Sequence, residues 1–148
     1  MEKVDTVCLV SCVWPKRATA ALAKDLYRSA WFLKARACAE SAGSSWFILS
    51  AEYGLVHPDE MIEPYEMTLD AMGVAERRNW SHHVQQQMDE RMPDASRIVV
   101  LAGQRYREFL MDYLAGRAVT VHVPMVGMRN GQQLSWLRKD RAIARHDY

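Results

Sequence analysis

Four short runs of apolar and β-branched residues limit what this chain can fold into. They lie at residues 6–13, 45–51, 97–103 and 118–124, and segments with helical periodicity separate them. The first three runs are nearly continuous in apolar character, which is typical of strands buried on both faces, whereas the fourth alternates and favours an edge position. We therefore expect one α/β domain over residues 1–148, built in three layers around a four-stranded, mainly parallel sheet.

Helical periodicity fills most of the space between these runs. Ser29 is a candidate N-cap for a helix that Gly43 would end, and a second helix is expected over 74–92. The spacing of apolar residues from Tyr106 to Leu114 predicts a third helix, and a final helix carries Leu134 and Leu137. Residues 52–69, with two prolines and a glycine, are expected to form a long structured loop.

Composition excludes several classes of protein. The chain carries 19 basic and 18 acidic side chains, so its net charge of +1 creates no global field that favours nucleic acid. No apolar run is long enough to span a bilayer, and residues 1–15 do not resemble a secretory signal. Three scattered cysteines indicate reduced thiols. We expect a cytoplasmic monomer with no membrane partner, no metal and no cofactor.

The distribution of charge is more informative than its sum. Six acids and no Lys or Arg lie between Glu52 and Asp70, which leaves the rest of the chain basic. Fourteen of the 19 basic residues are Arg, the side chain suited to bidentate phosphate contacts. This acidic segment is either a carboxylate site that faces an anionic substrate or a solvated surface loop.

The ends of the predicted strands indicate where a ligand would bind, because ligands of open parallel sheets lie beyond the carboxyl ends of the strands. Here those ends lead into residues 11–16, 50–65, 103–106 and 124–132, which we expect to converge on one pocket. The chain has no G-x-x-x-x-G-K-[ST] phosphate loop, no G-x-G-x-x-G after the first strand and no G-x-S-x-G elbow.

The acidic segment suits cleavage of an N-glycosidic bond, in which a carboxylate stabilises a sugar carbon that becomes positively charged. Asp59, or failing that Glu60, is the candidate for this carboxylate. The alternative is structural, with Asp59 capping the turn beside Pro58.

Aromatic and basic residues near the strand ends could hold such a substrate. Tyr53 or Tyr65 could stack on the base, and Lys16 or Tyr27 could hydrogen-bond its edge; alternatively the two stacking tyrosines only buttress the loop. Arg129 is a candidate phosphate contact.

The segments LSAEYGLVHPDE, EPYEMTL and GMRNGQQLSWL resemble a small bacterial and phage domain family of unknown function, over residues 6–137. Members resemble, more remotely, the bacterial peroxide-stress protein family and the base-handling domain of archaeosine synthases. The strand and loop order is similar to the uracil-DNA glycosylase fold, in which the loop after the first strand holds a water-activating acid. Here that loop begins SCVWPKR and contains no acid until Asp25, which makes Asp25 the third candidate carboxylate.

The resemblance also implies a function and a set of residues. Similar small proteins are associated with defence against phages that carry modified bases, so it implies a DNA glycosylase. The substrate-site residues that it marks, beside the acids, are Ser11, Cys12, Lys16, Tyr27, Glu52, Tyr53, Gly54, Tyr65, Gly103 and Tyr106.

Three functions remain open from the sequence. The first is an enzyme that cleaves the N-glycosidic bond of a nucleobase in DNA, RNA or a nucleotide. The family resemblance implies that this base is modified. The second is a non-catalytic nucleic-acid or nucleotide-binding module of stress or defence. The third is a small-molecule α/β hydrolase with Cys12 as its nucleophile.

Overall fold

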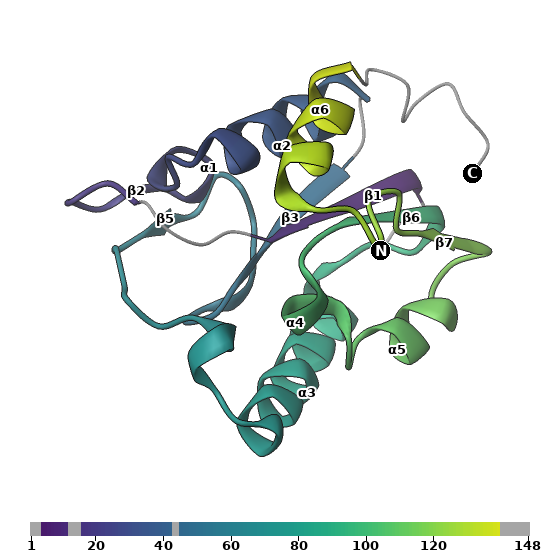
Figure 1. Cartoon of the computed structure of the whole chain (residues 1–148). Coiled ribbons are helices and arrows are strands. Elements are labelled where there is room, and N and C mark those ends of the chain that lie inside the picture. Colours follow the sequence, from purple (N-terminus) through teal and green to yellow (C-terminus); the bar gives the residue numbers. More distant parts are fainter. Residues whose placement is uncertain (1–3, 12–15, 43–44, 140–148) are drawn as a thin grey trace.

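A mixed five-stranded sheet forms the centre of the protein, with helices against both of its faces (Figure 1). The computed structural model describes residues 4–11, 16–42 and 45–139. The strand order is β4-β3-β1-β6-β7. The strands comprise β1 (Val4–Ser11), β3 (Ser45–Ser50), β4 (Gly54–Val56), β6 (Ala95–Leu101) and β7 (Thr120–His122).

Strands β3, β1, β6 and β7 pair in parallel, and β7 lies at an edge as its alternating pattern predicts. The prediction of only four strands is wrong, because β4 pairs antiparallel with β3. Gly54 makes this reversal possible with a φ of 75°, which a residue with a side chain rarely adopts. The amide of Gln87 then holds the turn, accepting from the Leu55 N–H at 2.8 Å and donating to the Tyr53 carbonyl at 3.1 Å.

The segment expected to be only a loop therefore contains regular structure. Besides β4 it holds β5 (Met61–Ile62), which pairs with β2 (Ala21–Leu22) in a small antiparallel sheet. A 3₁₀ turn, η1 (Leu69–Ala71), ends it. The β2–β5 pairing links the segment to residues far away in sequence, which local patterns do not reveal.

Each face of the large sheet buries its own apolar core. On one face Leu9, Phe47 and Ile98 pack with α3 (Val74–Arg91), α4 (Gln104–Arg107) and α5 (Met111–Ala115). On the other face Val10 and Ile48 pack with α1 (Ala23–Leu26), α2 (Ala30–Ser41) and α6 (Asn130–Lys139). The expected layers of helix, sheet and helix are present (Figure 1).

Two helices show how local and distant interactions compete. Helix α2 begins where predicted, because the Ser29 hydroxyl accepts the Phe32 N–H at 3.0 Å. The helix expected from Tyr106 to Leu114 is instead divided into α4 and α5. The Phe109 carbonyl at the break accepts from the Ser81 hydroxyl of α3 at 2.9 Å, an interaction that no periodicity within 106–114 could predict.

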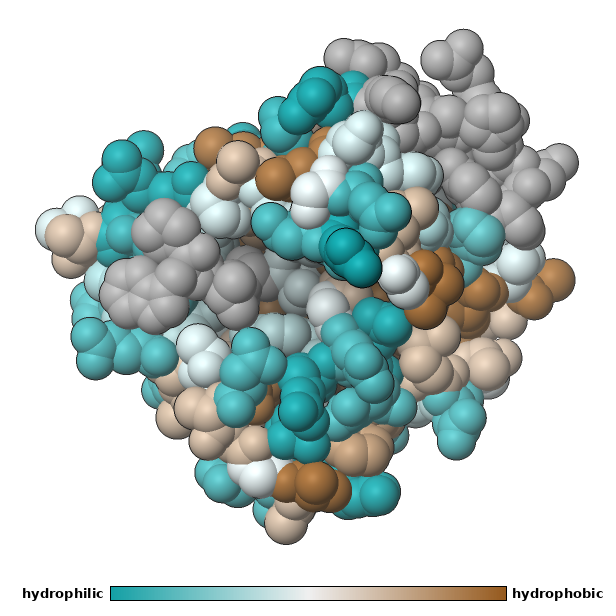
Figure 2. All heavy atoms as spheres, in the orientation of Figure 1, coloured by the Kyte–Doolittle hydropathy of each residue, from teal (hydrophilic) through white to brown (hydrophobic). Residues whose placement is uncertain are grey.

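The face of the molecule seen in Figure 1 is mainly hydrophilic (Figure 2). Apolar side chains gather on it toward the β7 edge, where Val119 is 86% exposed.

Candidate functional site

A cavity of about 570 Å³ lies among the described residues, and its volume is within the range of small-molecule sites. We call it the central cavity. It is lined by Ser11, Ser29, Ala30, Trp31, Asp70, Gly103, Gln104, Arg105, Tyr106, Asn130, Gln133 and Leu134.

The position of the central cavity follows from the order of the strands. From β1 the chain passes to β3 on one side and later to β6 on the other, so the order reverses between β1 and β6. Crevices at such a reversal, beyond the carboxyl ends of the strands, are where open α/β sheets bind ligands. Ser11 ends β1, and its hydroxyl accepts the N–H of Gly103, just beyond β6, at 3.2 Å.

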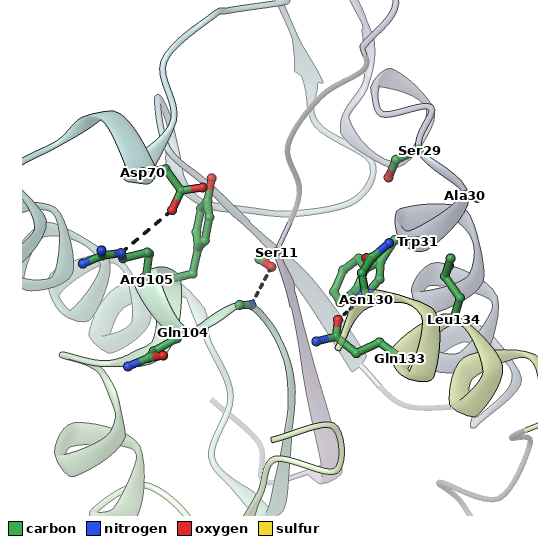
Figure 3. Close-up of a pocket in the computed structure, with 12 residues that line it drawn as sticks. Ser11, Ser29, Ala30, Trp31, Asp70, Gln104, Arg105, Asn130, Gln133 and Leu134 are labelled. Carbon is green, nitrogen blue, oxygen red and sulfur yellow. Dashed lines mark hydrogen bonds and ion pairs between the residues drawn. The ribbon is translucent and has the colours of Figure 1, made fainter. Parts of the chain in front are cut away.

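Two walls face each other across the central cavity (Figure 3). Asp70 of η1 and Arg105 of α4 lie on one side, and Trp31 of α2 lies on the other with Asn130 and Gln133 of α6. Ser11 lies between the two walls. One wall is therefore charged, while the other combines an aromatic ring with neutral amides.

The orientation of Trp31 is held by hydrogen bonds. Its indole N–H donates to Oε1 of Gln133 at 2.8 Å, and Nε2 of the same amide donates to the Met128 carbonyl at 2.9 Å. Both ends of the Gln133 amide are thus occupied, so it cannot turn without breaking one of these bonds. The half-buried indole is consequently a pre-positioned flat surface.

The opposite wall carries a loose ion pair. Nε of Arg105 lies 4.0 Å from a carboxylate oxygen of Asp70, and the side chains are 51% and 76% exposed. An ion pair that is long and solvated contributes little to folding. Asp70 and Arg105 therefore remain available to a ligand.

The structure brings several of the predicted substrate residues to the central cavity. Ser11, Gly103 and Tyr106 line it. Arg129 is exposed and directly precedes Asn130 of the cavity wall. Cys12 lies outside the described residues.

Four other predicted residues form a separate cluster, in which Tyr27 is only 1% exposed and Lys16 only 8%. Nζ of Lys16 lies 4.4 Å from the centre of the Tyr65 ring, and the Tyr65 hydroxyl is 2.7 Å from that of Tyr27. The Tyr53 ring meets Tyr65 edge to face, with centroids 5.6 Å apart. These contacts hold the 52–69 segment against residues 16–27, and burial leaves Tyr27 no open face for a base. Glu52 is exposed beside this cluster in sequence, and Gly54 serves the β4 turn.

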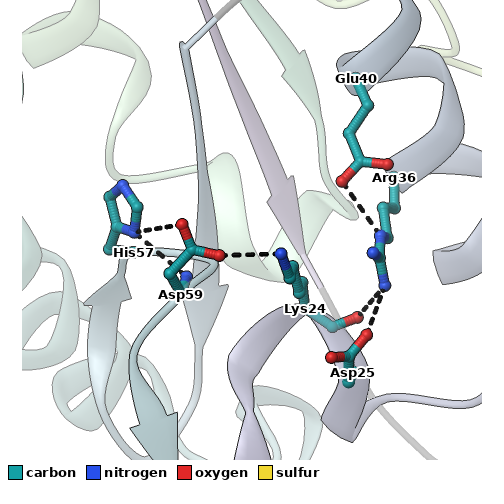
Figure 4. Close-up of polar contacts among 6 residues, drawn as sticks. All are labelled: Lys24, Asp25, Arg36, Glu40, His57 and Asp59. Carbon is teal, nitrogen blue, oxygen red and sulfur yellow. Dashed lines mark hydrogen bonds and ion pairs between the residues drawn. The ribbon is translucent and has the colours of Figure 1, made fainter.

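The three predicted catalytic carboxylates do not line the central cavity. Asp59 lies 2.9 Å from Nζ of Lys24, Asp25 lies 2.9 Å from Arg36, and Glu60 pairs with Arg91. Figure 4 shows most of these groups, which we call the ionic cluster: Lys24, Asp25, Arg36, Glu40, His57 and Asp59.

A smaller cavity of about 340 Å³ borders the ionic cluster. Its lining includes Ser45, Trp46 and Phe47, which begin β3, so this region lies at the amino end of that strand. The acids predicted for catalysis thus gather at the edge of the sheet opposite to the central cavity.

Electrostatic pairing in the ionic cluster changes ionisation. The hydrogen bond and charge of Lys24 lower the pKa of Asp59, and Asp59 in turn raises the pKa of Lys24. Both groups are held in their charged forms at neutral pH, which suits an ion pair and not a proton donor.

Of the residues that line the central cavity, Gln104, Arg105 and Asn130 lie within the predicted ranges 103–106 and 124–132, and Ser29 is predicted as a helix N-cap. Sequence reasoning did not select Ala30, Trp31, Asp70, Gln133 and Leu134 for a site. A signal existed for Asp70, the last acid of the acidic segment. Trp31 carried none, because its position resembles that of an ordinary apolar helix residue.

Residues 4–11, 16–42 and 45–139 contain neither a candidate metal cluster nor a helix suited to cross a membrane. No group of three or more His, Cys, Asp or Glu side chains there could hold a metal ion. Within the same ranges, no helix combines the length and apolar character that a membrane crossing requires.

Comparison with known proteins identifies a family. Neither the curated proteins nor the solved structures include a match to this chain. A family model does match it, over residues 7–139, and its description is a family of unknown function (DUF6884). Since this match spans most of the sequence, the chain belongs to that family.

Proposed function

We propose that the chain binds a nucleobase in the central cavity and cleaves the N-glycosidic bond that joins the base to its sugar. The observation that carries this proposal is the pairing of walls: a fixed indole, Trp31, faces a lightly paired carboxylate, Asp70 (Figure 3). A base that stacks on the indole directs its sugar toward the carboxylate.

The Trp31 wall suits a planar, uncharged heterocycle. Stacking of a base on an aromatic side chain contributes about 1–3 kcal/mol and tolerates different bases. Asn130 on the Trp31 wall and Gln104 on the Arg105 side of the cavity offer amides that both donate and accept hydrogen bonds, as the edges of bases require (Figure 3). Among the lining residues Asp70 is the one acidic side chain, so the base itself meets no fixed negative charge except at the opposite wall.

Asp70 has the chemistry for the bond-breaking step. As the bond breaks, its electron pair leaves with the base nitrogen and the sugar carbon becomes positive. The Asp70 carboxylate stabilises that charge and accepts a proton from the attacking water, whose oxygen bonds to the carbon. The departing base takes up a proton from solvent, and Asp70 then returns its proton to solvent. An amide N–H of the opposite wall can hydrogen-bond the leaving nitrogen.

This assignment moves the carboxylate from the predicted Asp59, Glu60 or Asp25 to Asp70. All three predicted acids are occupied by Lys or Arg partners outside the central cavity. The resemblance to the uracil-DNA glycosylase fold, to the base-handling domains and to the peroxide-stress family supports a nucleobase ligand. It also supports the finer proposal of a modified base in DNA, removed by a defence protein, and the scattered cysteines support a cytoplasmic one.

The direct test is release of a free base. The purified chain is incubated with oligonucleotides that carry different modified bases, and mass spectrometry detects the released base and the remaining abasic strand. We expect release from at least one substrate. Asp70→Asn should slow it about a hundredfold or more while affinity changes little, because the carboxylate acts most strongly as charge develops.

Asp59→Asn is the matched control, since it removes the same group from the ionic cluster and should keep the full rate. A full rate in Asp70→Asn would contradict the assignment. Slow release by Asp59→Asn, Glu60→Gln or Asp25→Asn would show that the catalytic carboxylate is one of the acids predicted from sequence. Binding of oligonucleotides without release of any base would mean that the chain is a binding module and not an enzyme.

A further inference from the structure

The Arg105–Asp70 ion pair indicates whether the central cavity selects a nucleoside or a nucleotide. We propose that Arg105 binds a phosphate of the substrate, so that the site takes nucleotides and not free nucleosides. This inference rests on the proposed function, because it assigns a second part of the same ligand.

Arg105 is placed for this role by its surroundings. It lines the central cavity on the same wall as Asp70, and its side chain is half exposed. A sugar directed toward Asp70 brings its attached phosphate to that wall. The guanidinium presents paired N–H donors whose geometry matches phosphate oxygens.

The existing partner of Arg105 does not prevent this contact. At 4.0 Å, with both side chains solvated, the Asp70 interaction is too long for a direct hydrogen bond and is screened by salt. Phosphate, with shorter charge-assisted hydrogen bonds, competes well against it.

Phosphate binding has a consequence for Asp70. When Arg105 turns to the phosphate, the carboxylate loses its nearest cation and faces the sugar with its charge less neutralised. The phosphate therefore supplies affinity and also prepares the carboxylate for the positive charge that develops on the sugar carbon.

Two other arginines have partners of their own outside the central cavity. Arg107 on the same helix donates to the Ala102 carbonyl at 3.0 Å, and Arg78 of α3 lies over the Phe109 ring at 4.3 Å. Neither lines the central cavity, so Arg78 provides a matched control for loss of one positive charge.

The experiment measures affinity by calorimetry for three classes of ligand that share each base. These are the deoxynucleosides, their 5′- and 3′-monophosphates, and single-stranded trinucleotides. We expect monophosphates and trinucleotides to bind about ten- to hundredfold more tightly than nucleosides. Tighter binding of trinucleotides alone would also support the proposal and would identify the phosphate as that of a strand.

Arg105→Ala should remove this preference and reduce the salt dependence of trinucleotide binding by about one phosphate contact. Arg105→Lys should restore part of the preference, because it keeps the charge without the paired donors. Asp70→Asn should preserve or increase it, since the competing carboxylate is gone. Arg78→Ala should leave it unchanged.

Equal affinities for nucleosides and nucleotides would overturn the inference and leave base cleavage untouched. A preference that survives in Arg105→Ala would overturn it as well. Phosphate preference without any base release would support the inference while contradicting the proposed reaction. No binding of any ligand would overturn both.

Discussion

The central cavity and the ionic cluster are built from different chemistry, although both lie at ends of the same sheet. In the ionic cluster almost every charge meets an opposite charge, as in Lys24 with Asp59 and Arg36 with Asp25 (Figure 4). In the central cavity a tryptophan, amides and hydroxyls surround one loose ion pair (Figure 3). The first region has the higher density of titratable groups, yet the second has the larger cavity and a carboxylate and a guanidinium that are only loosely paired.

The comparison shows why a run of acids is a poor guide to a catalytic site. Carboxylates that lie close in sequence need not face the same cavity, because each turns toward the nearest cation that the fold supplies. Asp59 and Glu60 are neighbours, but one pairs with Lys24 of α1 and the other with Arg91 of α3. A site needs groups whose interactions are still incomplete, such as the loosely paired Asp70 and Arg105.

The largest expected effect that separates the two regions is on ligand affinity. Trp31→Ala removes the stacking surface and should weaken binding of an oligonucleotide about ten- to hundredfold. Trp46→Ala is the control, since Trp46 borders the smaller cavity of the ionic cluster and packs against Phe32. Fluorescence anisotropy of a labelled strand measures both variants.

The same assay would also detect a ligand that binds beside the ionic cluster instead of in the central cavity. If Trp46→Ala weakens binding and Trp31→Ala does not, the ligand lies beside the ionic cluster. Trp31→Phe should fall between wild type and Trp31→Ala, because it keeps a ring but loses the N–H bond to Gln133.

A second, smaller effect concerns folding. Arg36→Ala removes contacts to Asp25, to Glu40 and to the Lys24 carbonyl, so we expect a loss of about 1 kcal/mol in the free energy of unfolding. Urea denaturation measures this loss, and oligonucleotide affinity should be unchanged. Lys34→Ala on the same helix should alter stability by less than about 0.5 kcal/mol. A drop in affinity at unchanged stability would show that the ionic cluster binds ligand.

The smallest expected effect is a pH dependence of the ionic cluster. Because Lys24 lowers the pKa of Asp59, the pair stabilises the fold above the ordinary Asp pKa of about 3.9 and loses this contribution as pH falls through the lowered value. Wild type should therefore exceed Asp59→Asn in stability at pH 7, and the difference should disappear in acid. Glu52→Gln is the control, as the described residues include no ion partner for Glu52. A difference that persists in acid would mean that the substitution acts through packing.

Much of the fold was predictable because its signals are local. The apolar runs became β1, β3, β6 and β7, and the Ser29 cap began α2 as expected. The pocket at the carboxyl ends was predicted in outline from strand order, and Ser11, Gly103 and Tyr106 do line the central cavity. The acidic segment was misread as loop alone, because β4 and β5 each require a distant partner.

The sequence by itself determined the positions of β1, β3, β6 and β7 and the start of α2, because periodicity, capping and β-branching act within a few neighbouring residues. Only the tertiary structure decided which side chains meet. The β4 turn depends on Gln87, 33 positions beyond Gly54, and the break between α4 and α5 depends on Ser81. Likewise, Trp31, Asp70 and Gln133 come from three separate segments, and their convergence on one cavity arises from long-range packing that no short window of sequence contains.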